Sequence, residues 1–233
     1  MPHIENLQKK LKCQIGSLNR IKDNVPAHLH NELYHPLFES PLRYGITVWG
    51  HGSYSKLEPL FNLQKKCLRI MFGDREAYLA KFETCARCRP FGNQALDAEF
   101  FMNEHSKPLF NTHNLFTLYN LYNYHALVET LKILKYRKPI SLYSLFTISR
   151  RKESLLITPS SSHDFIHRSS TLWNLVRQKF KIFDFAGSIG AFKTQLKNLI
   201  LKTQKTGDYV AWNDSEIDIR NSIVPNYPPN FVP

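Results

Sequence analysis

Residues Lys56 to Phe72 make up the segment that most restricts the fold. Apolar side chains recur there at helical spacing on one face, whereas Lys65, Lys66 and Arg69 fall on the opposite face. We therefore expect an amphipathic helix with a basic outer surface. Its expected inward positions are Leu60, Leu63, Cys67, Ile70 and Met71.

Other segments repeat this spacing. Residues 115–134 are long enough for a central core helix, and Gly187 to Lys205 has the pattern of a final helix. Ser170 and Thr171 are suitable caps for a helix that continues through Phe180. The pattern predicts a mainly α fold, an irregular helical bundle with long loops and a disordered C-terminal tail.

The stretch from Leu33 to Gly50 reads LYHPLFESPLRYGITVWG and holds no obvious catalytic residue. Pro26 suits the first turn of a helix that runs into this stretch. Pro36 should kink or interrupt that helix, because proline has no backbone N–H to donate. We interpret the stretch as a packing segment whose buried side chains are Leu33, Leu37, Phe38, Tyr44, Ile46 and Trp49.

Residues 157–170, ITPSSSHDFIHRSS, have the composition of a long loop and mark a candidate boundary. We expect a first helical region over residues 1–156 and a C-terminal helical unit over residues 157–205. Residues 206–233 contain four prolines near the end of the chain and should form a poorly ordered tail.

The charge of the chain favours a polyanionic partner. Its 233 residues include 31 Lys and Arg against 19 Asp and Glu, which gives a formal charge of +12. RNA or DNA is the leading candidate, ahead of an anionic membrane surface. The densest cluster consists of Lys132, Lys135, Arg137, Lys138, Arg150, Arg151 and Lys152.

Four tyrosines lie near this cluster, so phosphate neutralisation combined with stacking of rings on bases is physically available. The equally simple alternative is a set of solvated helix faces, with the tyrosines half-buried in the core. The tyrosines are Tyr119, Tyr122, Tyr124 and Tyr136.

Cys85 and Cys88 have the spacing with which two thiolates share a tetrahedral zinc ion. The remaining ligands would have to come from residues such as His105 or His113, and no second Cys-x-x-Cys pair is present. Two reduced cysteines at the end of a helix are the simpler interpretation. We therefore expect no cofactor, with zinc as the alternative.

The segment MPHIENLQKKLK has no apolar core of signal-peptide length, and no stretch approaches the roughly 20 apolar residues of a membrane span. We expect an intracellular protein of the nucleus or cytoplasm, not secreted and not associated with a membrane. Its cysteines should then be reduced.

Catalytic patterns are missing from the sequence. Phosphoryl transfer by metal ions needs paired carboxylates on rigid elements. The densest acidic group, Asp214, Glu216 and Asp218, lies in the expected tail. Residues 160–163 place a serine near a histidine, but without an elbow motif or an orienting acid. We expect no enzymatic activity from this chain on its own.

An ordered series of short motifs covers most of residues 3–202. It consists of His3-Ile4, Leu7, Lys10-Leu11, Gly16, Leu33-Tyr34-His35, Leu37-Phe38-Glu39-Ser40, Leu42-Arg43-Tyr44-Gly45, Val48-Trp49-Gly50, Leu63-Gln64-Lys65-Lys66, Leu68-Arg69-Ile70, Glu104-His105-Ser106-Lys107-Pro108-Leu109-Phe110 and Leu118-Tyr119-Asn120-Leu121-Tyr122. The series resembles the region after the palm in reverse transcriptases of jockey-like non-LTR retrotransposons.

This resemblance implies the thumb and following helical region of an RNA-directed DNA polymerase encoded by a mobile element. In that family the catalytic aspartates lie upstream in the palm and match no position here. The thumb region holds the template-primer duplex through its backbone, and Lys65, Lys66 and Arg69 match its basic helix. Pro36 and Pro41 depart from the family pattern and fit a decayed or relaxed copy.

Two functions follow as expectations. The first is a catalytically inert reverse-transcriptase fragment that binds nucleic acid without sequence specificity and whose other partner is the upstream palm. The alternative is a host protein, derived from such an element, that serves as a helical nucleic-acid-binding or scaffold module. A zinc-dependent enzyme is a third possibility.

Overall fold

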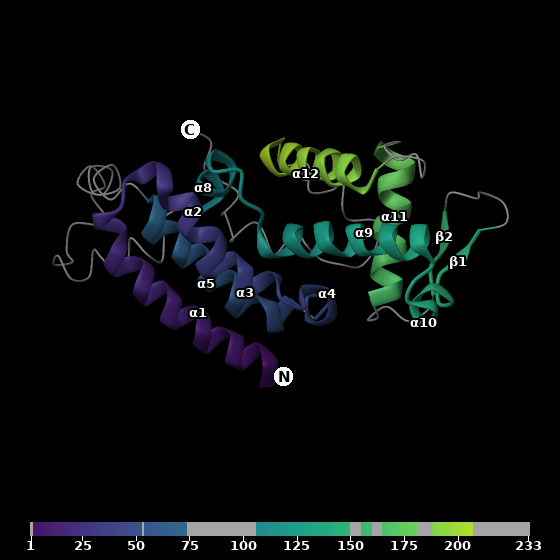
Figure 1. Ribbon diagram of the computed structural model, residues 1–233, viewed down its shortest axis with the longest axis horizontal. Coiled ribbons are helices and arrows are strands. Elements are labelled where there is room, and N and C mark those ends of the chain that lie inside the picture. The colour runs from purple at the N-terminus through teal and green to yellow at the C-terminus, as the bar shows by residue number, and fades with distance from the viewer. Residues whose placement is uncertain are drawn as a thin grey trace, which may run out of the picture. The chain divides into compact units, whose positions relative to one another are not determined.

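The computed structural model describes residues 2–52, 54–73, 106–149, 155–159, 165–180 and 188–206 (Figure 1). Helices make up nearly all of the regular structure in these ranges, so the expected mainly α fold is confirmed. In the described ranges, no helix is both long enough and apolar enough to cross a membrane. Residues 207–233 of the expected disordered tail lie outside them.

The chain divides into two compact units. Unit 1 contains residues 1–44 and 59–118, and unit 2 contains residues 45–58 and 119–233. Each unit therefore combines an early and a later part of the chain. The division expected from the sequence, with residues 1–156 and 157–205 as separate regions, stays a prediction.

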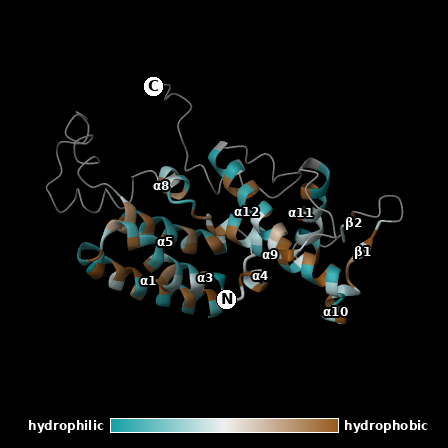
Figure 2. Ribbon diagram, turned by 45° about the horizontal axis from the view of Figure 1, so that its top comes forward, coloured by the Kyte–Doolittle hydropathy of each residue, from teal (hydrophilic) through white to brown (hydrophobic). Residues whose placement is uncertain are grey.

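Unit 1 begins with helix α1, Pro2–Ile21. Its buried residues are spaced three or four positions apart, so they form one stripe along the helix. Hydrophilic and hydrophobic residues alternate along the ribbon of α1 in Figure 2. The stripe contacts the segment that contains Pro36 and Pro41. Its members are Ile4, Leu7, Leu11, Ile15 and Leu18.

The two prolines lie in an interrupted helix. Two short 3₁₀ turns, η1 (Lys22–Asn24) and η2 (Ala27–Leu29), lead into α2 (His30–Tyr34). The π turn η3 (His35–Glu39) and helix α3 (Ser40–Arg43) follow. Pro36 falls inside the π turn, where its missing N–H cannot close a normal helical turn. The expected interruption at Pro36 is confirmed.

The packing expected for this stretch is partly confirmed. Phe38, Ile46 and Trp49 are buried, whereas Leu33 and Leu37 are half-buried. The expected burial of Tyr44 is wrong, since 77% of this residue is exposed. Helix α3 ends at Arg43 and Gly45 adopts a left-handed conformation, so Tyr44 falls outside the helical stripe of the preceding residues. Tyr34 and Leu42, at i−4 and i+4 from Phe38, are the further buried members of that stripe.

Among the described residues of unit 1, the remaining helices are α5 (Tyr54–Phe72), of which residues 59–72 belong to this unit, and α8 (Ser106–Thr112). Most of the inward face expected for α5 is confirmed. Leu63 is only half-buried. Leu60, Cys67, Ile70 and Met71 are buried.

A buried amide joins three segments of unit 1. Gln64 is completely buried in α5 and donates to the Tyr34 hydroxyl at 3.0 Å and to the Phe116 carbonyl at 2.9 Å. Its Oε1 accepts from the Leu118 N–H at 2.8 Å. Burial raises the pKa of Tyr34 well above its ordinary value, so the phenol stays protonated as a donor and acceptor.

Unit 2 is built around helix α9 (Leu118–Tyr136), all but the first residue of which belongs to it. Buried residues occur on several sides of α9, as expected of a central core helix. Helix α4 (Ile46–Trp49) and helix α10 (Ile140–Tyr143) also belong to this unit. Strands β1 (Thr147–Ile148) and β2 (Leu156–Ile157) pair in antiparallel fashion, with Thr147 opposite Ile157.

Unit 2 also contains two long helices, α11 (Phe165–Phe180) and α12 (Ile189–Thr206). The rings of Trp173 in α11 and Phe192 in α12 are stacked with centroids 6.4 Å apart. A buried hydrogen bond of 2.8 Å from Asn120 to Gln204 joins α9 to α12. The expected inward face of α12 is confirmed at Phe192, Leu196, Leu199 and Ile200, and Ile189 is half-buried.

The start expected for α11 is wrong. Ser170 and Thr171 lie in the interior of a helix that begins at Phe165, and Ser170 is fully buried. The buried face extends back through Ser169, one turn before Leu172 and Trp173, because a serine is small enough for neighbouring side chains to cover. Residues 165–170 therefore belong to the helix rather than to the expected loop.

We expect Gln64→Leu to lower the free energy of unfolding by about 3 kcal/mol, because it leaves the partners of the amide buried and unsatisfied. Urea-induced unfolding followed by circular dichroism measures this loss. Asn62→Leu is the matched control, since Asn62 is exposed on the same helix, and it should change the value by less than about 0.5 kcal/mol. Equal losses for the two variants would contradict a structural role for the amide.

Candidate nucleic-acid interface

The C-terminal end of α9 concentrates positive charge. Lys135, Arg137 and Lys138 are exposed, and Lys132 is half-exposed one turn earlier. Residues 132–149 contain no Asp or Glu. Cations at this end of a helix are favourable because the backbone carbonyls there carry partial negative charge. Lys135 in the last turn therefore stabilises the helix end, and the cluster as a whole presents a positively charged surface.

Arg137 adopts a left-handed backbone conformation with φ of 54° directly after α9. Glycine is the usual residue at such a position, and a side chain there costs about 1 kcal/mol. The guanidinium carbon lies 5.9 Å from the centroid of the Tyr143 ring. The turn therefore places the guanidinium near a ring of α10, at some cost in backbone energy.

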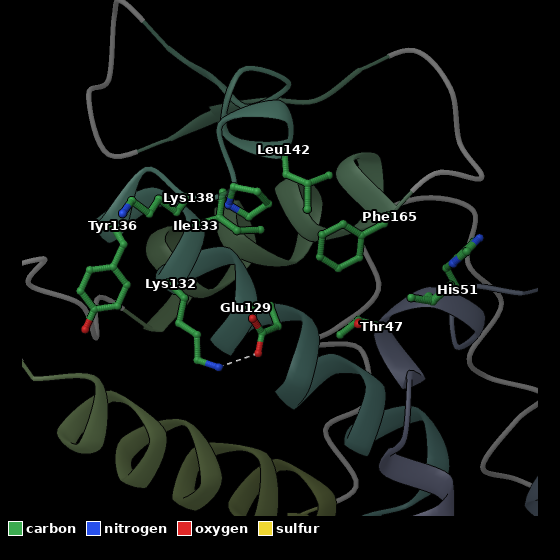
Figure 3. Close-up of a pocket in the computed structure, with 11 residues that line it drawn as sticks. Thr47, His51, Glu129, Lys132, Ile133, Tyr136, Lys138, Leu142 and Phe165 are labelled. Atoms are coloured by element: carbon green, nitrogen blue, oxygen red, sulfur yellow. Dashed lines mark hydrogen bonds and ion pairs between the residues drawn. The ribbon is translucent and has the colours of Figure 1, made fainter.

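A pocket of about 820 Å³ lies beside these cations in unit 2 (Figure 3). Its lining is mainly apolar and includes Ile133, Leu142 and Phe165 from three helices. Lys132 and Lys138 also line it, which joins the pocket to the basic end of α9. Lys132 Nζ forms an ion pair of 2.7 Å with Glu129.

A glycine holds α4 against α9 on one side of this pocket. Gly50 ends α4, and a Cβ at this position would lie 2.6 Å from Cδ2 of Tyr122 and would clash with the Ile46 carbonyl oxygen. Only a residue without a Cβ allows this approach. Thr47 and Val48 of α4 consequently reach the pocket lining.

The four tyrosines near the cluster differ in exposure. Tyr122 is buried, and burial raises its pKa to about 12, against the opposing effect of Arg168. Tyr119 and Tyr124 are half-buried, whereas 58% of Tyr136 is exposed. Of the two interpretations left open by the sequence, tyrosines half-buried in the core fit Tyr119, Tyr122 and Tyr124, because α9 is central and covered on several sides. Tyr136 is the one ring of the four that is exposed enough to stack on a base.

The basic face of α5 differs from the expectation at one residue. Lys66 is exposed, and Lys65 is half-buried with Nζ 4.8 Å from the centroid of the Phe61 ring. The expected exposure of Arg69 is wrong, since only 9% of this residue is exposed. Its neighbours Leu68 and Ile70 are both buried, so the last turns of α5 are covered on most sides.

Several predicted site residues lie outside the described residues. These are Arg150, Arg151 and Lys152 of the basic cluster and Cys85, Cys88 and His105 of the possible zinc site.

The ring centroids of His113 and Phe72 lie 4.0 Å apart. The pKa of His113 is lowered, mainly because the ring is partly buried and to a smaller extent because of the charge of His30. The described part of the chain contains no group of three or more metal-ligating side chains.

The outer face of α1 is a basic surface that was not among the predicted site residues. Glu5 is the single acidic residue of the helix, and the cations lie opposite its buried stripe. The same three-and-four spacing that marks the buried stripe would have located them. The exposed cations are Lys9, Lys10, Lys12 and Arg20.

Comparison with protein-family models, with curated proteins and with solved structures finds no match for this chain. The candidate interface is therefore identified from the geometry and charge of its own residues alone.

We expect Gly50→Ala to lower the free energy of unfolding by about 1–3 kcal/mol, because the added methyl group forces α4 away from α9. Thermal and urea unfolding measure the change. Gly190→Ala is the control in the same unit, since the nearest heavy atom to a Cβ there is 3.8 Å away. That variant should be neutral or slightly stabilising, and a similar loss at both positions would refute the close contact.

Proposed function

We propose that this chain binds RNA or DNA through the phosphate backbone, without sequence specificity and without polymerase activity of its own. The observation that carries the proposal is the placement of three exposed cations within four consecutive residues, Lys135 to Lys138, at the end of α9. Lysine and arginine neutralise phosphates and release condensed counterions, which supplies most of the free energy of non-specific binding.

The overall charge supports the same proposal. A formal charge of +12 attracts a polyanion over long range and speeds its association. The outer face of α1 and the exposed Lys66 of α5 add cations in unit 1. Arg69 is not among the proposed contacts, because its side chain is buried.

The resemblance to the post-palm region of jockey-like non-LTR reverse transcriptases suggests the context of this binding. In that context the chain is the C-terminal part of an RNA-directed DNA polymerase, and the upstream palm is its second partner. A thumb-like region needs contacts to the nucleic-acid backbone and no catalytic aspartates, which agrees with the basic surfaces described above.

The second candidate function is a host helical scaffold that binds another protein. Exposed apolar side chains around α10 and the small sheet favour it, because such clusters are typical of protein interfaces. Ile140 is 75% exposed and Leu145 is 55% exposed. Absent or salt-insensitive nucleic-acid binding, together with a stable protein partner, would favour this function.

We expect the triple variant Lys135→Gln, Arg137→Gln and Lys138→Gln to bind a labelled 20-base-pair duplex about ten-fold or more weakly near 0.1 M salt. The plot of log K against log salt concentration has a negative slope, and three lost phosphate contacts should make it shallower by about 3. Fluorescence anisotropy over a salt series measures both quantities.

The matched control replaces Lys193, Lys197 and Lys202 of α12 with glutamine. These side chains are exposed in the same unit, and the change in net charge is identical. A loss confined to the first triple variant supports the basic end of α9 as the contact. Equal losses would show that net charge alone drives binding.

A further inference from the structure

We infer that the pocket beside the basic end of α9 accepts an unpaired base, so that the chain prefers single-stranded nucleic acid to duplex. This inference rests on the proposed function, because the phosphates on either side of the base are held by the same cations. It adds a ligand and a strand preference that charge alone does not provide.

The size and lining of the pocket suit a flat ring system. Its volume of about 820 Å³ lies within the range of roughly 300–1,000 Å³ that is usual for small-molecule sites. Two aromatic residues line it, Phe165 at the start of α11 and Tyr136 at the end of α9. Figure 3 shows the ring of Phe165 close to Leu142, with Tyr136 on the other side of Ile133. Aromatic faces stack on bases without regard to sequence.

The residues at the pocket carry a net positive charge, which favours a negatively charged ligand. Among the described residues that line it, Glu129 is the single carboxylate, and its ion pair with Lys132 neutralises it. Lys138 lines the pocket, and Lys135 and Arg137 are exposed on the adjacent turn. A nucleotide combines the two requirements of the site, an apolar flat group and a neighbouring negative charge.

The preference for a single strand follows from the need for a base to be unpaired before it can enter the pocket. A base in a duplex is paired and stacked, and it enters a pocket only after it has been extruded from the helix, which costs free energy. A base in a single strand avoids most of this cost. Cations alone favour the duplex, which has the higher charge density and releases more counterions per contact. A preference for single strands would therefore come from the pocket.

Two residues of α10 provide a matched pair of variants. Leu142 lines the pocket and is 36% exposed, whereas Ile140 is 75% exposed and is not part of the lining. Leu142→Asp places a negative charge at the base-binding site, and Ile140→Asp places the same charge two residues away.

The experiment measures the affinity of the full chain for labelled oligo(dT), oligo(rU) and a duplex of equal length, at one salt concentration. We expect the unchanged chain to bind the single strands about ten-fold more tightly than the duplex. Leu142→Asp should remove most of this preference, and Ile140→Asp should leave it. Phe165→Leu keeps an apolar side chain and should also reduce the preference, which separates loss of the ring from loss of folding.

Equal affinity for single strands and duplex would overturn the inference, as would equal effects of Leu142→Asp and Ile140→Asp. Displacement of oligo(dT) by poly-glutamate at the same concentration of charge would also overturn it, because a base would then contribute nothing. The absence of binding to any nucleic acid would refute the proposed function itself. Binding without strand preference would refute the pocket inference alone.

Discussion

The buried amide of Gln64 is the interaction on which the packing of unit 1 depends. It bonds to the buried hydroxyl of Tyr34 in α2, to the carbonyl of Phe116 and to the N–H of Leu118 at the start of α9. Apolar contacts alone tolerate small shifts between helices, whereas three directional bonds to one side chain do not. The amide therefore selects one arrangement of α2, α5 and residues 116–118 from the many that their apolar faces would allow.

The spacing of apolar residues in the sequence predicted the helices that bury one face or that are buried on all sides. α5, α9 and α12 were located within a few residues of their observed bounds, because a helical face or core helix leaves a local pattern. The start of α11 was missed because Ser169 and Ser170 are polar in sequence yet buried in the helix. Arg69 was misplaced for the converse reason, since its burial depends on neighbours that the spacing within α5 does not reveal.

The candidate site was predictable only in part. Its cations lie within seven residues of one another in the sequence, from Lys132 to Lys138, so the charge cluster could be identified directly. The pocket could not, because Val48, Ile133 and Phe165 are far apart in the chain and are brought together by tertiary packing. The contact of Gly50 with Tyr122 that positions α4 likewise leaves no local signal beyond the glycine itself. The sequence thus located the cationic part of the candidate site, whereas the pocket beside it is visible only in the structure.

Helix stability explains some of the cations at the end of α9 and not others. Lys132 is held by Glu129, and Lys135 lies in the last turn, where a positive charge stabilises the helix terminus. Arg137 and Lys138 follow the last helical residue, and Arg137 takes a left-handed conformation that favours glycine. Stability would be served better by glycine at position 137. The left-handed Arg137 is therefore the part of the cluster that helix stability does not explain. Its contact with the Tyr143 ring and the proposed binding of an anion are two separate explanations for it.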